Sequence, residues 1–286
     1  MILPDFKLAT RQNCVWQKSG IDSLSLCRDK SHFKNYPHRV VYDYNSRGFR
    51  DSEWPDNLDE LRQAIWCIGD SFTVGIGSPL EYTWVNVLQH ITGRRCINIS
   101  MDGASNDWIT RKTLDIINVI NPVTPIMIQY SFWHRWENSD TSLSDEDRRC
   151  AYDVAADCAE LAEQFVKQHT SLTSTGKDIV FSTIPNGFTR MYGSTVQAWD
   201  HHFQDYFKDH WIICPLSVKE FYSLPNHVKT EALKCPKITN LVKMYEIIDG
   251  EKFYTVNQID FARDYFHYDK LTSANVADYF ASFVDV

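Results

Sequence analysis

The 286-residue sequence lacks the C-x-x-C spacing of zinc ribbons and thioredoxin-like sites, although it contains eight cysteines. A chain of this length can bury a sizeable core and does not need disulfides in its place. Cys67 and Cys96 lie inside apolar runs, where a thiol packs as a small hydrophobic group. We therefore expect the thiols to be mostly reduced, which suits a cytoplasmic setting.

Long apolar runs and clusters of basic residues are also missing. No stretch approaches the roughly 20 apolar residues of a membrane span. Residues 1–6 have neither the basic start nor the apolar core of a signal peptide, so we expect a cytoplasmic location. With 29 Lys and Arg against 37 Asp and Glu, the net charge is −8. Nucleic-acid and anionic-membrane surfaces need clustered positive charge, so neither partner is expected.

Short apolar runs alternate with helical patterns from residue 64 onward, whereas residues 1–62 are polar and rich in turn formers. The runs predict strands at 64–68, 96–99, 126–130, 178–182 and 211–214. A 3.6-residue periodicity predicts helices at 82–91, 108–120, 145–169 and 272–283. This alternation indicates an α/β fold with a parallel sheet of about five strands. We expect 1–62 to be an N-terminal extension packed on a main domain (63–286), in which 185–260 is an elaborated insert region.

The segment from Ile68 to Gly77 reads Ile-Gly-Asp-Ser-Phe-Thr-Val-Gly-Ile-Gly and follows the first predicted strand. It places the Ser71 hydroxyl at the carboxyl edge of the sheet, where parallel sheets hold their chemistry. It does not match G-x-S-x-G, the P-loop or G-x-G-x-x-G. One interpretation is a serine nucleophile with amide donors for an oxyanion. The other is a tight turn in which Asp70 or Ser71 caps a helix.

A serine hydroxyl is a weak nucleophile and needs a base that is oriented by a third group. Asp264 and His267 lie three residues apart, just before the last predicted helix. At that spacing a loop can place the carboxylate against the imidazole, whose other nitrogen then faces the serine. Taken alone, the same pattern also fits a surface turn with an exposed histidine.

Together, these two segments resemble the SGNH hydrolases, also called GDSL-type esterases, over residues 64–286. The resemblance implies a flavodoxin-like three-layer α/β/α fold and no metal or organic cofactor. It also implies that Ser71 is the nucleophile, His267 the base and Asp264 its orienting group. The oxyanion would be held by the amides of Ser71 and of Gly103, which follows the second predicted strand.

The third motif of that family, Gly-x-Asn-Asp, is missing where it should follow the third strand. The chain there reads Tyr-Ser-Phe-Trp-His-Arg-Trp-Glu from Tyr130 to Glu137. The loss of one oxyanion donor typically lowers the rate ~10²–10³-fold. Asn106 and His134 are candidate replacements, although Asn106 could instead cap the next helix and His134 could be a packed or surface residue. Arg135 and Glu137 could form an ion pair beside the site.

We expect a serine hydrolase that cleaves an acyl or acetyl ester, with a carbohydrate ester or a small-molecule ester as substrate. Two alternatives stay open: a glycan- or ligand-binding module on a non-catalytic scaffold of this type, and an acyltransferase with the same triad. His201, His202 and His210 lack a carboxylate partner and regular spacing, so we expect polar residues there rather than a metal site. The aromatic residues between 192 and 211 are expected to pack in the core or to line a cleft. The sequence does not determine the oligomeric state.

Overall fold

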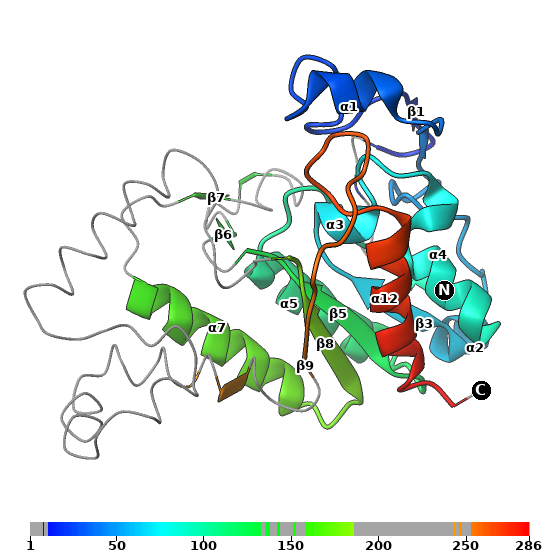
Figure 1. Ribbon diagram of the computed structural model, residues 1–286. Helices are drawn as coiled ribbons and strands as arrows, with labels where there is room; N and C mark the ends of the chain where they lie inside the picture. Colours follow the sequence, from blue (N-terminus) through cyan, green and yellow to red (C-terminus); the bar gives the residue numbers. More distant parts are fainter. Residues whose placement is uncertain are drawn as a thin grey trace, which may run out of the picture.

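The computed structural model describes residues 8, 11–132, 135–137, 142–143, 151–152, 158–185, 243, 246–247 and 253–285. Its main element is a five-stranded parallel sheet (Figure 1). The strands are β3 (Ile65–Ile68), β4 (Cys96–Asn98), β5 (Ile126–Tyr130), β8 (Ile179–Thr183) and β9 (Phe253–Thr255). They lie in the order β4-β3-β5-β8-β9, and all neighbouring pairs are parallel. Numbered along the chain, this is the 2-1-3-4-5 order of flavodoxin-like folds.

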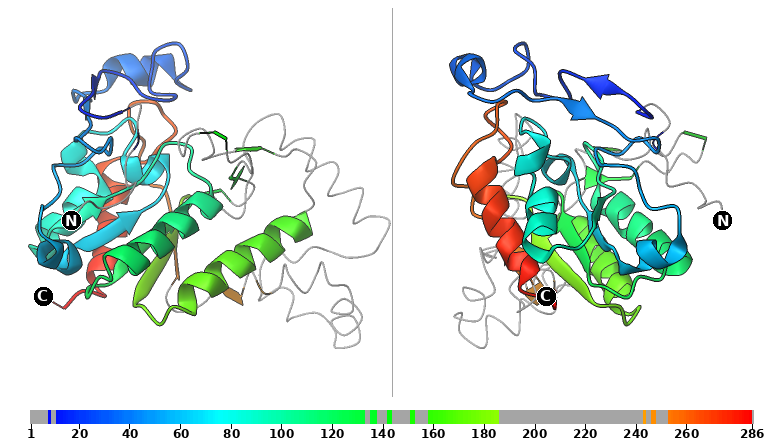
Figure 2. Two further views of the ribbon diagram at one scale, coloured as in Figure 1. Left: turned by 180° about the vertical axis from the view of Figure 1, so that it is seen from behind. Right: turned by 90° about the vertical axis from the view of Figure 1, so that its right-hand side faces the viewer.

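Helices cover both faces of the sheet and complete a three-layer α/β/α arrangement. The helix α4 (Trp84–Thr92) packs against α12 (Lys270–Ala281), and α5 (Asn106–Val119) packs against α7 (Cys158–Thr173). Figure 2 shows α12 on one side of the sheet and α5 with α7 on the other. The predicted fold class is therefore confirmed.

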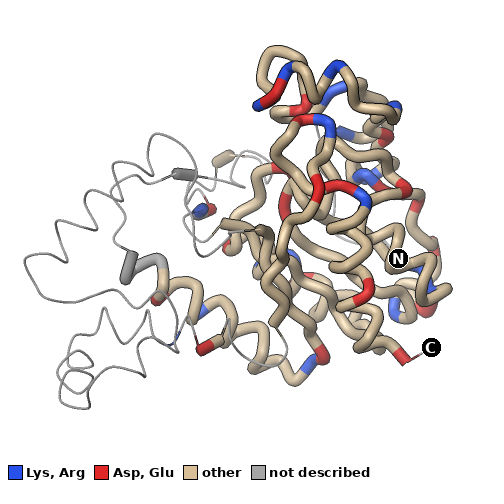
Figure 3. The backbone as a smooth tube through the Cα atoms, viewed as in Figure 1, with Lys and Arg blue, Asp and Glu red and all other residues tan. Residues whose placement is uncertain are grey.

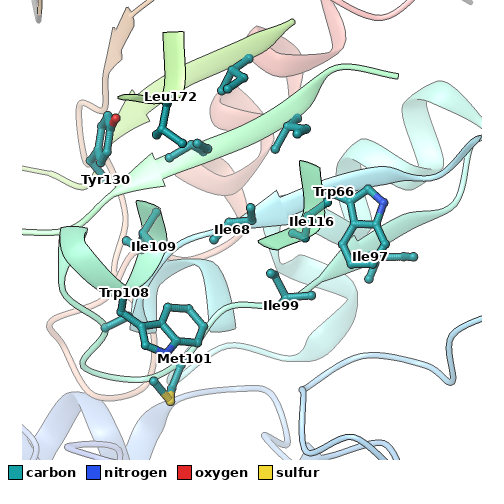
Figure 4. Packing of buried hydrophobic residues seen from close by; sticks show 14 of the residues in the cluster. Trp66, Ile68, Ile97, Ile99, Met101, Trp108, Ile109, Ile116, Tyr130 and Leu172 are labelled. Atoms are coloured by element: carbon teal, nitrogen blue, oxygen red, sulfur yellow. The ribbon is translucent and has the colours of Figure 1, made fainter. Parts of the chain in front are cut away.

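Successive side chains of a strand point to opposite sides of the sheet. Each face of the sheet therefore has its own hydrophobic core. Trp66 and Ile68 of β3 enter the cluster under α5 and α7, which is drawn in Figure 4. Ile65 and Cys67 of the same strand enter the cluster under α4 and α12. All four residues are fully buried, which explains why the strand is a continuous apolar run rather than an alternating one.

Most of the N-terminal segment, residues 11–57, lies over the carboxyl edge of the sheet, and its last part runs down the side of the sheet to α2 (Figures 1 and 2). It contains the antiparallel strands β1 (Val15–Trp16) and β2 (Tyr42–Asp43) and the helix α1 (Lys30–Asn35). Helix α2 (Leu58–Gln63) then leads into β3. The remaining short elements are α3 (Ser71–Val74), the 3₁₀ helix η1 (Leu80–Tyr82) and the antiparallel pair β6 (Arg135–Trp136) and β7 (Ala151–Tyr152).

Buried Arg50 attaches this N-terminal segment to the end of α3. Its Nη1 donates to the carbonyls of Val74 (3.1 Å) and Gly75 (2.5 Å). Its Nη2 donates to the carbonyls of Val41 (2.9 Å) and Ser78 (2.8 Å). The planar guanidinium can serve four carbonyls at once because its donors point in fixed, divergent directions.

The long predicted helix at 145–169 is wrong at residues 151 and 152. Ala151 and Tyr152 form strand β7, and the described helix begins at Cys158 and continues to Thr173. Pairing with β6 gives the backbone of these two residues hydrogen-bond partners outside a helix, so tertiary contact overrides the local periodicity. The other three predicted helices match α4, α5 and α12 to within two residues at each end.

The fifth strand of the sheet comes from a part of the chain that the apolar pattern did not single out. β9 has only three residues and lies within the stretch for which the sequence indicated an elaborated insert. The strand predicted at 211–214 lies outside the described residues, as do His134, His201, His202 and His210.

Charges of both signs are interspersed along the described chain (Figure 3). None of the described helices has the length and apolarity that crossing a membrane requires. In the same residues no group of three or more His, Cys, Asp or Glu side chains is arranged to hold a metal ion. Cys27, Cys67 and Cys96 are free thiols.

We predict that Arg50→Lys lowers the free energy of unfolding by about 3 kcal/mol, because a single ammonium cannot serve all four buried carbonyls. Urea denaturation followed by tryptophan fluorescence measures the change. Arg39→Lys, at an exposed position of the same segment, is the control and should stay within about 0.5 kcal/mol of the wild type. Equal effects of the two substitutions would contradict this role of Arg50.

Candidate active site

Ser71 is the first residue of α3, directly after the turn that follows β3. Asp70 caps this helix, since its Oδ1 accepts from the Phe72 amide at 3.0 Å. The cap that the sequence suggested is therefore present, and Asp70 rather than Ser71 provides it. The Ser71 hydroxyl lies at the carboxyl edge of the sheet and is 3% exposed.

Gly69 allows α3 to begin at Ser71, only three residues after the last residue of β3. A Cβ at this position would come within 2.1 Å of Thr73 Oγ1 and within 3.0 Å of the Gln129 carbonyl oxygen. Thr73 Oγ1 also donates to Gln129 Oε1 at 3.0 Å. The glycine and this buried hydrogen bond together hold α3, and with it Ser71, against β5.

Asp264 and His267 lie in the loop between β9 and α12. Asp264 Oδ1 accepts from the amides of Phe266 and His267, both at 3.0 Å. Asp264 Oδ2 lies 2.5 Å from His267 Nδ1, and His267 Nε2 lies 2.9 Å from Ser71 Oγ. The structure thus joins the three side chains in one line of hydrogen bonds, although His267 follows Ser71 by 196 residues.

The direction of these hydrogen bonds follows from the charge of Asp264. Burial would raise the pKa of the Asp264 carboxyl, but the His267 imidazole and the hydrogen bonds from the imidazole and the two amides outweigh burial and hold the pKa below its ordinary value. A carboxylate can only accept, so His267 Nδ1 carries the proton and Nε2 is left to accept from the Ser71 hydroxyl. This tautomer is the one that a general base for Ser71 requires.

Aromatic rings hold the imidazole from the side. The ring centroids of Phe72 and Phe266 lie 4.5 Å and 4.9 Å from that of His267. His267 itself is only 3% exposed. Its ring is therefore fixed both by packing and by its hydrogen bonds to Asp264 and Ser71.

The loop after β4 begins beside the turn that carries Ser71, because the Met101 amide donates to the Gly69 carbonyl at 3.3 Å. Gly103 lies in this loop with a φ of 78°, in the left-handed region that favours glycine. Within the described chain, the amides of Ser71 and Gly103 donate to no other protein group. Both are therefore available as donors on the edge where Ser71 lies.

Asn106 is not the cap of α5, because Ser105 takes that place and its Oγ accepts from the Trp108 amide at 3.3 Å. The Asn106 side chain instead reaches the end of β5. Its Oδ1 accepts from the Ser131 amide at 2.8 Å, and its Nδ2 donates to the Ser131 carbonyl at 3.2 Å. One of the two Nδ2 protons is used in this way, and the second is left for another acceptor.

Arg135 has a different partner from the one expected. It pairs with Asp70 at 2.9 Å, whereas Glu137 pairs with Arg111. Ser131 Oγ also donates to Asp70, at 2.7 Å. Burial raises the pKa of Asp70, and the Arg135 charge is the strongest of the effects that oppose this rise.

Sequence reasoning missed the contacts of Asp70 with Ser131 and Arg135 beside Ser71. The signal that could have found them is an Asp next to the serine, followed by a Ser and an Arg at the end of the third strand. Parallel strands end at one edge, so residues that follow β3 and β5 meet there.

No protein-family model matches the sequence, and no curated protein matches it. Among solved structures, the chain is similar to a protein described as a lipolytic protein of the G-D-S-L family from Desulfitobacterium hafniense DCB-2. The identity is 12% and the TM-score 0.39, over 78% of this chain and 99% of that chain. A family two carbohydrate esterase from Clostridium thermocellum matches at 14% identity and a TM-score of 0.38, over 80% of this chain and 65% of that one.

The structural neighbours thus include G-D-S-L lipolytic proteins and carbohydrate esterases, the class that the sequence motifs resemble. An acetyl xylan esterase, Est2A from Butyrivibrio proteoclasticus, is another, with 12% identity and a TM-score of 0.36 over 77% of this chain and 63% of that one. At such identities and TM-scores the neighbours carry no argument about this chain's reaction, which has to come from the side chains of the site.

We predict that Asp264 stabilises the fold at neutral pH and loses this effect in acid. Its pKa is lower in the folded protein than the unfolded value, so the contribution is complete above that value, about 4, and falls as the pH drops through the folded pKa. The difference in unfolding free energy between wild type and Asp264→Asn should therefore shrink from about pH 6 to about pH 3. Urea denaturation at each pH measures it.

Asp56→Asn, which removes an exposed carboxyl, is the control for that pH series, and its difference from the wild type should stay flat. If the difference in unfolding free energy between wild type and Asp264→Asn also did not change with pH, Asp264 would not be stabilised as a carboxylate in the folded protein.

Proposed function

We propose that the protein is a serine hydrolase that cleaves an acyl or acetyl ester through Ser71, His267 and Asp264. The observation that carries the proposal is the line of hydrogen bonds from Ser71 Oγ to His267 Nε2 (2.9 Å) and from His267 Nδ1 to Asp264 Oδ2 (2.5 Å). A hydroxyl, an imidazole and a carboxylate in this order form the constellation that activates a serine in acyl transfer.

In the first half-reaction, Ser71 Oγ bonds to the ester carbonyl carbon while its proton passes to His267 Nε2. The electron pair of the carbonyl double bond moves to the oxygen, which becomes an oxyanion. When the oxyanion collapses, the bond from carbon to the alcohol oxygen breaks and His267 Nε2 returns the proton to the leaving alcohol. Asp264 keeps its charge throughout and stabilises the imidazolium.

In the second half-reaction, water replaces the alcohol. Its oxygen attacks the acyl carbon as one of its protons passes to His267 Nε2. The bond from the carbon to Ser71 Oγ then breaks, Oγ takes the proton back, and the acid leaves. An acyltransferase would use an acceptor hydroxyl at this step in place of water.

The oxyanion requires donors that point at the place where its charge develops. We assign this role to the amides of Ser71 and Gly103 and to the Nδ2 of Asn106. The support is that neither amide donates elsewhere within the described chain, and that the Asn106 amide group is held by Ser131 with one proton to spare. Asn106 would then replace the asparagine of the missing third motif.

We predict that a fluorophosphonate probe labels Ser71 and that the protein hydrolyses p-nitrophenyl acetate. Ser71→Ala should abolish both, because the hydroxyl that forms the acyl-enzyme is gone. Gel fluorescence and the release of p-nitrophenolate measure the two outcomes. Adding an acetylated xylan and an acceptor sugar to the assay separates a carbohydrate ester from a simple ester, and hydrolysis from transfer.

Ser273→Ala removes an equally buried hydroxyl from α12 and is the matched control, expected to keep both labelling and turnover. Labelling or full turnover in Ser71→Ala would refute the assignment of the nucleophile. A wild type that binds glycans on an array without being labelled would favour the binding module instead.

We predict that Asn106→Ala lowers kcat by about 10²–10³-fold, the usual cost of one oxyanion donor. The rate is expressed per active site titrated with the fluorophosphonate, so that a loss of folded protein does not count. Thr113→Ala, also a buried polar residue of α5, is the control and should keep its kcat per site. A per-site kcat in Asn106→Ala within about threefold of the wild type would exclude Asn106 as an oxyanion donor.

A further inference from the structure

The N-terminal segment lies directly against the loop that carries Asp264 and His267 (Figure 1). The Arg28 amide donates to the Asp264 carbonyl at 3.1 Å. His32 Nε2 donates to the Ala262 carbonyl at 2.9 Å, two residues before Asp264. Segments more than 200 residues apart in the chain are thus joined through the backbone beside Asp264.

A closed ring of hydrogen bonds lies at the centre of this contact. Asp22 Oδ1 accepts from Arg263 Nε at 2.9 Å, and Asp22 Oδ2 accepts from Arg263 Nη2 at 2.6 Å and from the Tyr42 hydroxyl at 2.5 Å. The Tyr42 hydroxyl accepts from the Gly77 amide at 2.8 Å. The Gly77 carbonyl accepts from the Arg263 amide at 3.0 Å, which closes the ring.

Burial makes this ring strong. The side chains of Asp22 and Tyr42 are fully buried, and that of Arg263 is 15% exposed. A buried charge is tolerated only when it is paired and fully hydrogen-bonded, and Asp22 meets both conditions. Burial and the Asp22 carboxylate raise the pKa of Tyr42, so its hydroxyl stays a proton donor to Asp22.

The ring connects the two halves of the candidate active site. Gly77 lies six residues after Ser71, and Arg263 directly precedes Asp264. Gly77 has a φ of +81°, and a Cβ there would come within 3.2 Å of Asp264 Cγ. The backbone of Gly77 therefore packs closely on Asp264. For this reason the ring sets the distance between the segment that follows α3 and the Asp264 carboxylate, which is hydrogen-bonded to His267.

We propose that Asp22 is a positioning residue of the active site: through Arg263 and Tyr42 it holds the Asp264–His267 loop at hydrogen-bonding distance from Ser71. This inference rests on the proposed esterase function. Asp22 acts through other residues and does not touch the reacting atoms. A displacement of about 1 Å between reacting groups costs ~10² in rate, so the loss of this ring should lower turnover without altering substrate binding.

The test uses the full chain with Asp22→Asn, which keeps the shape but removes the charge, and Tyr42→Phe, which removes the hydroxyl shared by Asp22 and Gly77. We expect kcat per titrated active site to fall about 10- to 100-fold in both variants while KM stays within about twofold. Tyr36→Phe is the matched control, since its hydroxyl also joins the N-terminal segment to a half-buried carboxylate, Asp269, at 2.8 Å, but lies outside the ring. Its kcat per site should not change.

Hydrogen exchange followed by mass spectrometry tests the same hypothesis without an activity assay. The peptide spanning residues 262–268 should exchange about 10-fold faster in Asp22→Asn and Tyr42→Phe than in the wild type or in Tyr36→Phe. Unchanged exchange in this peptide would overturn the proposal. An equal loss of kcat in Tyr36→Phe would also overturn it, because general destabilisation would then explain the effect.

The two proposals fail in distinguishable ways. If the wild type is neither labelled by the fluorophosphonate nor active on p-nitrophenyl acetate, the esterase function fails, and the exchange of residues 262–268 alone decides whether Asp22 holds the loop. If the wild type is active and per-site kcat in Asp22→Asn equals that of the wild type, the esterase function stands and the positioning role of Asp22 is refuted.

Discussion

The rest of the structure has to bring Ser71 Oγ and His267 Nε2 to within 2.9 Å of each other. Ser71 follows β3 and His267 follows β9, and two other strands, β5 and β8, lie between them in the sheet. Strand pairing therefore does not bring these residues together. The chain after β9 has to return along the carboxyl edge, and the packing of α12 on α4, the helix that links β3 to β4, brings it back to Ser71.

Polar groups below the site hold this edge in place. Gln129 is fully buried in the central strand β5, where its Oε1 accepts from Thr73 and from the Tyr268 hydroxyl. Thr73 belongs to α3, the helix of Ser71, and Tyr268 follows His267, so the Gln129 side chain contacts both halves of the candidate site from inside the sheet. Such a buried network specifies one arrangement only when its members are satisfied.

The sequence predicted the parts of the fold that depend on local pattern. The continuous apolar runs of β3, β4, β5 and β8 are visible because both faces of these strands are buried. The short β9 was missed because three residues show no period, and β7 was hidden inside a helical pattern because its pairing with β6 is a tertiary effect.

In the candidate active site, too, local patterns could be predicted and tertiary contacts were missed. Ser71, Asp264 and His267 could be selected from the order and spacing of short motifs, and the structure brings the three together. The partners of Arg135 and Asn106 were not predicted, because they lie on different elements that meet only after the sheet has formed. The ring around Asp22 was equally hidden, since an Asp, a Tyr and an Arg far apart in the sequence show no local pattern.

The separation of 196 residues between Ser71 and His267 also orders events during synthesis of the chain. Ser71 and the first four strands of the sheet are synthesised before His267. Until the segment after β9 has been made, the Ser71 hydroxyl has no His267 imidazole as its hydrogen-bond partner. The line of hydrogen bonds from Ser71 to Asp264 is therefore completed last, by one late segment of the chain.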